Sequence, residues 1–450
     1  MSFVHNEYKS GFQHDFPYQD PSEADAVFGE QKKRYRGCLL GCGLGCLGII
    51  VLSVIASVVF YFYCLKGRPL EVSAETTIIT EPKKKDGKSV DFFRAVNELA
   101  APKVPDGENG FKDILAGYGK AVFDTVENAP MWHYPAMCKV FNIDSFGIPP
   151  YVLTEAESDT PEQWLTVIGP GLDAAVAASM KPAYFIPLIR QNENDIILAS
   201  QPISVYQFHG ELTKALRFRA AHRFSKGDYA GGWKDYLATL RLFRTVTVNS
   251  VLYSGLKRND EGNALLLNPE DFREVIAKMP PELRSQAVKD IESLPRWQDR
   301  KTTLKALQFS VLDIISATDD IPKLLDKFSS QPIPADARAF ADIIGFDWNL
   351  VAVRLNMEFE AFERELTAAG DDEAKLTAVL NRRFQSNLDM GDMVKACFVD
   401  VSFDDVTVAG RSETAGQVAG FIAAHFAGQM FSLQLEEEKR CQTLKEELGK

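Results

Sequence analysis

The chain has 450 residues, of which 46% are hydrophobic and 25% charged, and this composition excludes a fully disordered chain, a collagen and a multi-span transporter. Its 62 acidic residues outnumber its 50 basic ones, so the net charge is -12 and nucleic acid is not an expected partner. Seven cysteines in a chain of this length do not make a disulfide framework.

An uncharged run near the N-terminus predicts a transmembrane helix at residues 37–65. No side chain in this run carries a formal charge, whereas a bilayer core of about 30 Å needs only about 20 helical residues. Basic residues flank both ends, and aromatic residues lie where interfacial aromatics belong. These features favour a bilayer-spanning helix over a buried core helix, and they make the lipid bilayer an expected partner.

The charges around this run predict its orientation. Basic residues crowd positions 32–36, whereas only Lys66 and Arg68 lie close to the other end. By the positive-inside rule, the N-terminus is cytoplasmic and the large C-terminal part lies outside the cytoplasm, on the periplasmic side. Residues 1–36 lack helical or strand periodicity, which predicts a disordered cytoplasmic tail.

Small residues recur every four positions at the start of the predicted anchor. Gly37, Gly41 and Gly45 would share one helix face, where small residues allow a second helix to approach closely. Two interpretations stay open: a face for self-association or docking, and simple tolerance of glycine at the membrane boundary.

Proline usage divides the rest of the chain. We expect a juxtamembrane linker at residues 66–88, in which the β-branched run 71–80 allows one short strand. A Pro-rich mixed segment follows at 89–209, because more than half of the 22 prolines fall between residues 69 and 202 and proline blocks helix interiors. A multi-helix domain is expected at 210–450, built as hairpins, a bundle or a short solenoid. The predicted fold class is therefore mainly α.

Apolar spacing of three and four predicts the individual helices. In the Pro-rich segment they cover residues 90–101, 110–127 and 165–180. In the helical domain they cover 270–279, 281–293, 297–317, 320–329, 335–344, 346–369, 372–388, 390–399 and 412–447. Residues 398–408 are the one strand-like interruption.

The stretch from Ala220 to Leu240 resembles the turn and second helix of a tetratricopeptide repeat, with Gly227 at the tight turn. No second copy lies about 34 residues away, so a single helical hairpin is expected. A wider order of features follows: the Gly- and Cys-rich anchor, the Pro-rich segment, this hairpin, then Phe346-Asp347-Trp348-Asn349 before a charged helix. This order resembles uncharacterised single-pass helical membrane proteins of planctomycete-type bacteria, although the chain lacks their Gly-x-Tyr-Pro turn. The resemblance implies architecture and topology, and no activity.

No catalytic or nucleotide-binding motif stands out. The sequence has no Walker A pattern and no H-E-x-x-H, and its histidines lack metal-ligand spacing, so we expect no metal and no cofactor. The candidate ligand-binding residues are Trp132, His133 and Tyr134, in a loop between prolines where aromatic groups form a rigid pocket or pin the loop to the core.

The sequence thus predicts a membrane-anchored helical interaction or scaffold protein, and an enzyme is the less favoured reading. Its expected partners are the bilayer, other proteins or a second copy of the chain. The alternatives are a membrane-anchored hydrolase, with a site in the Pro-rich segment, and an anchored sensor whose cytoplasmic tail recruits a partner.

Overall fold

A computed structural model describes residues 52–61, 66–118, 161–190, 192, 195–197, 203–246, 269–297, 299–317, 345–383 and 407–450. The chain separates into two units, residues 1–63 and 64–450, and each is described here by itself.

In the first unit, residues 52–60 form a helix. Its large apolar side chains are all exposed: Leu52, Val54, Ile55, Val58, Val59 and Phe60, with Tyr61 after them. The rest of the predicted span 37–65 that belongs to this unit, and the predicted tail 1–36, lie outside the described residues. Among the described residues, no helix has both the length and the hydropathy that a bilayer crossing requires.

The second unit is helical wherever the structure describes regular elements, and extended segments meet there only in isolated bridges. The mainly α fold class is therefore confirmed for the described residues. In chain order the elements are α2 (Phe92–Ala100), the 3-10 helix η2 (Asp106–Glu108), α3 (Gly110–Tyr118), α5 (Pro161–Ser179), α6 (Ile203–Ser225), α7 (Tyr229–Val246), α10 (Pro269–Lys278), α11 (Pro281–Glu292), α12 (Arg300–Ser316), α15 (Trp348–Ala369), α16 (Glu373–Arg383) and α19 (Val408–Gly449).

Local chemistry explains several helix starts. Pro281 occupies the first turn of α11, where a missing N–H costs nothing. The Asp299 carboxylate accepts from the Thr302 N–H at the start of α12. The Asp347 carboxylate accepts from the N–H groups of Asn349 and Leu350 at the start of α15. These caps satisfy donors that a helix leaves unpaired at its first turn.

The expected helical hairpin is confirmed as α6 and α7. Gly227 joins the two helices with φ of 81°, a left-handed conformation that suits glycine. At Gly232 a Cβ would lie 2.6 Å from the Phe224 ring, so the two helices pack closely where a side chain is absent. The hairpin contributes Trp233, Tyr236 and other apolar residues to a core shared with α10 and α11.

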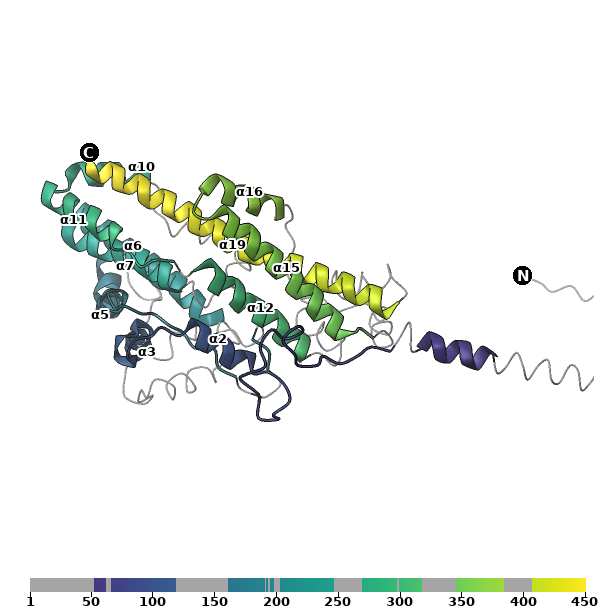
Figure 1. Ribbon diagram of the computed structural model, residues 1–450. Helices are drawn as coiled ribbons and strands as arrows, with labels where there is room; N and C mark the ends of the chain where they lie inside the picture. The colour runs from purple at the N-terminus through teal and green to yellow at the C-terminus, as the bar shows by residue number, and fades with distance from the viewer. Residues whose placement is uncertain are drawn as a thin grey trace, which may run out of the picture. The chain divides into compact units, whose positions relative to one another are not determined.

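Helix α19 links two hydrophobic cores. Its first half packs along α15, with Ala415, Ala419 and Ala423 in a core that also includes α2 and α12. Its last turns, with Cys441, Leu444 and Leu448, join the core of the hairpin, α10 and α11. Figure 1 shows α19 running beside α15 and on towards α10 and α11. A third core is formed by α3, α5 and the start of the hairpin.

Some helix boundaries differ from the predicted segments. Helix α5 covers the predicted helix 165–180 almost to its end, begins at Pro161, the proline start that precedes this helix in the sequence, and continues through Pro170. Helix α6 begins at Ile203, inside the predicted Pro-rich segment. The predicted helices 320–329, 335–344 and 390–399, and most of the strand-like run 398–408, lie outside the described residues.

The short strand expected at residues 71–80 is also wrong, because residues 74–77 form a turn. In this turn, hydrogen bonds from side chains take the place of the backbone bonds between strands. The Thr77 hydroxyl donates to the carbonyls of Ser73 and Ile79, at 2.9 and 2.8 Å. Such local bonds compete with a strand ladder for the backbone groups.

Residues 66–80 lie against α15 and are held there by specific hydrogen bonds. The Arg68 N–H donates to the Phe346 carbonyl at 2.8 Å, and the Trp348 N–H donates to the Arg68 carbonyl at 3.0 Å. The Glu71 N–H donates to the Asn349 side-chain oxygen at 2.8 Å. The Asn356 amide donates to the carbonyls of residues 75 and 76, at 2.8 and 3.0 Å. This segment is therefore part of the packed body.

Candidate functional site

The residues predicted from sequence as candidate sites lie outside the described residues. This holds for Trp132, His133 and Tyr134, and for the glycines at 37, 41 and 45. Both predictions stay untested. The described residues do, however, form a site that the sequence did not indicate.

A cleft of about 1090 Å³ lies along the last third of α19. We call it the α19 cleft. Its walls come from the end of α7, residues 296–304, the end of α15 with the start of α16, and residues 434–443 of α19. Four separate stretches of chain therefore build it, and the length of α19 brings them together.

One wall is a polar stripe on α19. Gln434, Glu438 and Gln442 line the cleft and are spaced four apart, which puts them on one helix face. Gln434 is only 6% exposed. Within the described structure its amide makes no hydrogen bond, and the amide atoms are not among the fully buried ones. Gln442 donates to Glu446 at 3.0 Å.

The opposite wall carries an aromatic ring, that of Trp297. Phe243 meets this ring edge-on, with centroids 5.8 Å apart, and the Arg244 guanidinium lies 5.6 Å from its centroid. The ring is half-buried. Its Nε1 is buried, and among the described residues no acceptor reaches it. This nitrogen is covered by protein, so a ligand in the cleft would meet the ring and not the N–H.

Ion pairs neutralise most of the charges around the cleft. Arg300 lies 3.6 Å from Asp371 and also donates to the Gly370 carbonyl. Lys301 pairs with Glu363 at 2.7 Å. A third ion pair, at 2.5 Å, joins α19 to α16.

Three charged groups at the cleft remain without such a pair among the described residues: Arg296, Asp299 and Glu438. The Asp299 carboxylate accepts instead from the N–H and the hydroxyl of Thr302. Partial burial raises the pKa of Glu438 above its ordinary value, and the Arg244 cation opposes this. One of these charges is positive and two are negative, so the cleft does not favour an anionic ligand.

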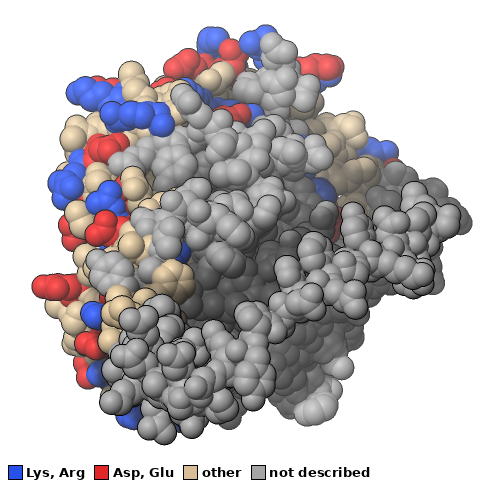
Figure 2. Space-filling view, turned by 90° about the vertical axis from the view of Figure 1, so that its right-hand side faces the viewer, with Lys and Arg blue, Asp and Glu red and all other residues tan. Residues whose placement is uncertain are grey.

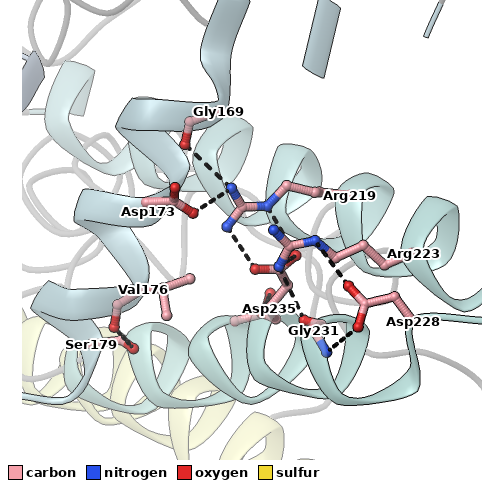
Figure 3. Close-up of polar contacts among 10 residues, drawn as sticks. Gly169, Asp173, Val176, Ser179, Arg219, Arg223, Asp228, Gly231 and Asp235 are labelled. Atoms are coloured by element: carbon pink, nitrogen blue, oxygen red, sulfur yellow. Dashed lines mark hydrogen bonds and ion pairs between the residues drawn. The ribbon is translucent and has the colours of Figure 1, made fainter. Parts of the chain in front are cut away.

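A separate ionic cluster braces the hairpin. Arg219 donates through Nε and Nη2 to both oxygens of Asp235, at 2.9 and 2.6 Å. Its third nitrogen donates to Asp173 at 2.8 Å. Arg223 adds a contact to Asp235 at 3.0 Å, and Figure 3 shows both guanidinium groups converging on this carboxylate. Because Asp235 is fully buried and saturated with donors, we read the cluster as a cross-brace between α5, α6 and α7.

The buried histidine of the hairpin is inaccessible. His209 Nε2 lies 2.7 Å from the Tyr184 hydroxyl, and burial lowers the pKa of His209 to about 3. A histidine this deeply buried neither meets a substrate nor takes up a proton at neutral pH.

Asp313 is a second buried titratable group. It is 0% exposed and accepts from the Ile197 N–H at 2.8 Å. In the described structure its other oxygen has no hydrogen-bond partner. Burial raises the pKa of Asp313 to about 6.

Neither a metal centre nor a reactive thiol appears in the described part of the chain. No group of three His, Cys, Asp or Glu side chains gathers there in a way that could hold a metal ion. Burial raises the pKa of Cys441 to about 12, which keeps this thiol protonated and inert.

Sequence reasoning missed the α19 cleft for a physical reason. Its four stretches are each separated from the next by about 50 to 60 residues in the chain, and helix packing alone brings them together. One local signal was available: residues 434, 438 and 442 place three polar groups on one face of a helix that is otherwise apolar on its packed side. Comparison of the chain with protein-family models, with curated proteins and with solved structures finds no match to any of them.

Proposed function

We propose that the chain is a membrane-anchored helical interaction or scaffold protein, attached to the bilayer through residues 37–65. The observation that carries this proposal is the helix at residues 52–60. Each of its large apolar side chains is about half exposed or more, from 49% at Val58 to 66% at Leu52. Exposing these apolar groups to water costs about 25 cal/mol for each Å² of apolar surface. Insertion into the hydrocarbon core of a bilayer removes this cost.

The body supports a scaffold role through its attachment. Residues 66–80 bond to Asn349 and Asn356 of α15, so the body begins within a few residues of the apolar helix.

The orientation in this proposal rests on charge. The basic residues between 32 and 36 favour a cytoplasmic N-terminus and a body on the periplasmic side. Figure 2 shows basic and acidic residues interspersed over the described part of one face of the molecule. Together with a net charge of -12, this mixture supports protein or small-molecule partners better than nucleic acid.

The test is extraction of membranes with alkaline carbonate, which releases peripheral proteins and leaves spanning ones. We expect the full chain to stay with the lipid pellet. Replacing Val54 and Val58 by Asp puts two charges into the span, at about 2.5 to 3.5 kcal/mol each at the centre of a bilayer, and should move the protein to the supernatant.

A matched control uses the same substitution on the body. Val167 on α5 is 68% exposed, so Val167→Asp should leave the protein in the pellet. Release of the unmodified chain by carbonate would overturn the anchoring proposal.

A further inference from the structure

We propose that the α19 cleft binds a carbohydrate, a neutral chain of several sugar rings. This goes beyond the scaffold role and does not depend on where the chain is anchored, because every group that carries it belongs to the second unit. The argument rests on the charge balance of the cleft, its unused polar groups and its aromatic wall.

The charge balance argues against an ionic ligand. Arg300 and Lys301 on one side are already paired with Asp371 and Glu363. A polyanion or polycation would have to compete for these pairs, and the remaining charges are one cation, Arg296, and two carboxylates, Asp299 and Glu438. A hydroxyl group can instead bond to a paired charge without displacing its partner, because it both donates and accepts.

The polar groups of the cleft that have no partner are hydrogen-bond donors and acceptors of the kinds that bind hydroxyl groups. The Gln434 amide offers two donors and one acceptor. Glu438 offers acceptors four residues further along the same helix face. Hydroxyls of a sugar supply both roles over a short distance, whereas a hydrocarbon ligand would leave these groups desolvated at about 1 to 3 kcal/mol each.

The apolar part of the cleft also fits a sugar better than a lipid tail. Leu304 and Leu366 line the cleft but are only 2% and 6% exposed, so they offer a ligand little surface. The half-buried ring of Trp297 is the one aromatic group among the described lining residues. A flat ring beside polar groups suits the C–H face of a sugar ring.

The size points to an oligosaccharide. The cleft's volume of about 1090 Å³ is at the upper end of the range for ligand sites, about 300 to 1,000 Å³. A single sugar ring would leave most of this space to water, whereas several linked rings would reach from Gln434 to Gln442.

Calorimetric titration of the full chain, in a detergent without a sugar headgroup, tests the proposal. The probes are maltohexaose, cellohexaose and chitohexaose, with hexagalacturonate as an anionic hexasaccharide. We expect at least one neutral probe to bind and hexagalacturonate to bind more weakly. Gln434→Leu should weaken neutral binding about tenfold, the effect of one unmet hydrogen bond at a buried polar group. Glu438→Gln should weaken it as well.

The control is Glu436→Gln, the same change of charge two residues away, at a side chain that pairs with Arg440 outside the cleft. It should leave binding unchanged. Three results would each overturn the proposal: no heat with any neutral probe up to its solubility, tighter binding of hexagalacturonate, and equal binding by the Gln434→Leu and Glu436→Gln variants. Thermal melting of each variant without ligand shows whether it is folded. If Gln434→Leu does not fold, Gln434→Glu takes its place, because it keeps the shape of the side chain. Its binding is then compared with that of the Glu436→Gln variant in the same way.

Discussion

The Arg244 guanidinium on α7 donates hydrogen bonds to both carboxylate oxygens of Glu437 on α19. Its Nε lies 3.1 and 3.2 Å from the two oxygens, and its Nη2 lies 2.9 Å from one of them. The Glu437 side chain is 0% exposed. The pair fixes the last part of α19 against the hairpin, and with it the face that carries Gln434 and Glu438.

Removing one partner of this pair should destabilise the body. Arg244→Met leaves the Glu437 carboxylate buried with the Cys441 thiol, which donates at 3.0 Å, as its remaining described partner. The expected loss in the free energy of unfolding is about 3 to 5 kcal/mol, measured by urea denaturation. The double variant Arg244→Met with Glu437→Leu should recover most of that loss, because no buried charge remains.

The surface pair Arg94 and Glu98 provides the comparison for that experiment. Both side chains are more than half exposed, so Arg94→Met should cost less than about 1 kcal/mol. A similar loss for Arg94→Met and Arg244→Met would contradict the role given to the buried pair.

Glycine spacing on α19 sets how closely it approaches α15. A Cβ on Gly416 would lie 2.4 Å from the Val351 carbonyl oxygen, a backbone atom that cannot rotate away. Gly416→Ala should therefore destabilise the body by about 1 to 3 kcal/mol. Gly449→Ala at the end of α19 has open space around it and should be neutral or stabilising by up to about 1 kcal/mol. Thermal melts of the two variants compare them directly, and an equal effect would rule out the close approach.

The buried Asp313 should make stability depend on pH. Its pKa is raised from 3.8 to about 6 in the folded chain, so the folded state binds more protons than the unfolded state between these values. The contribution of Asp313 to stability is thus most favourable below about pH 4, falls as the pH rises through about 6, and levels off above that. The shift corresponds to about 3 kcal/mol. The charged groups around Asp313 are Lys84, Arg190 and Asp91.

Asp313→Asn tests this, because it removes the titration and keeps the shape. Relative to the unmodified chain, the variant should gain about 3 kcal/mol in the free energy of unfolding between about pH 4 and about pH 8. Glu211→Gln at an exposed pair should show no such trend. Parallel stability curves for Asp313→Asn and the unmodified chain would contradict the raised pKa.

The bonds from Asn356 should hold the segment after the anchor in place. Asn356→Leu removes the two donors to the carbonyls of residues 75 and 76. Amide hydrogen exchange should then speed up about tenfold or more at residues 73–77, with little change in α19. Asn349→Leu should act on residues 69–71 in the same way. Unchanged exchange in both variants would mean that this segment is held by other contacts.

The small residues of the predicted anchor remain a test of self-association. If Gly41 and Gly45 face a second copy, replacing both with Ile blocks close contact of the backbones. Cross-linking through Cys42 in membranes should then be lost, and Leu44→Ile on another face should keep it. Equal cross-linking in both variants would leave the glycines as residues merely tolerated at the membrane boundary.

Local patterns predicted the helices well where one side of a helix is strongly apolar. In α15 the buried stripe of Phe359, Phe362 and Leu366 follows the apolar spacing that predicted a helix at 346–369. The start of α6 was missed because polar and apolar residues alternate irregularly over its first turns. The predicted helix 165–180 runs through Pro170, and α5 does the same.

Tertiary features were beyond what periodicity can predict. Gly416 and Gly420 show the same spacing of four that drew attention to the anchor, yet their role follows only from the position of α15. Trp297 and Gln434 both line the α19 cleft although they lie far apart in the sequence, and no local pattern predicts this. The buried bonds of Asn356 to residues 75 and 76 likewise join two segments about 280 residues apart.

Protease added to the outer face of sealed membranes tests the central claim most directly. If the chain is anchored through residues 37–65 with its body outside the cytoplasm, the protease should remove residues after about 66 and leave a protected fragment with the N-terminal tail and the anchor. Detection with tags at both ends identifies the fragment. A protected body with a digested N-terminus would contradict the orientation, and complete digestion without any protected fragment would contradict the anchor itself.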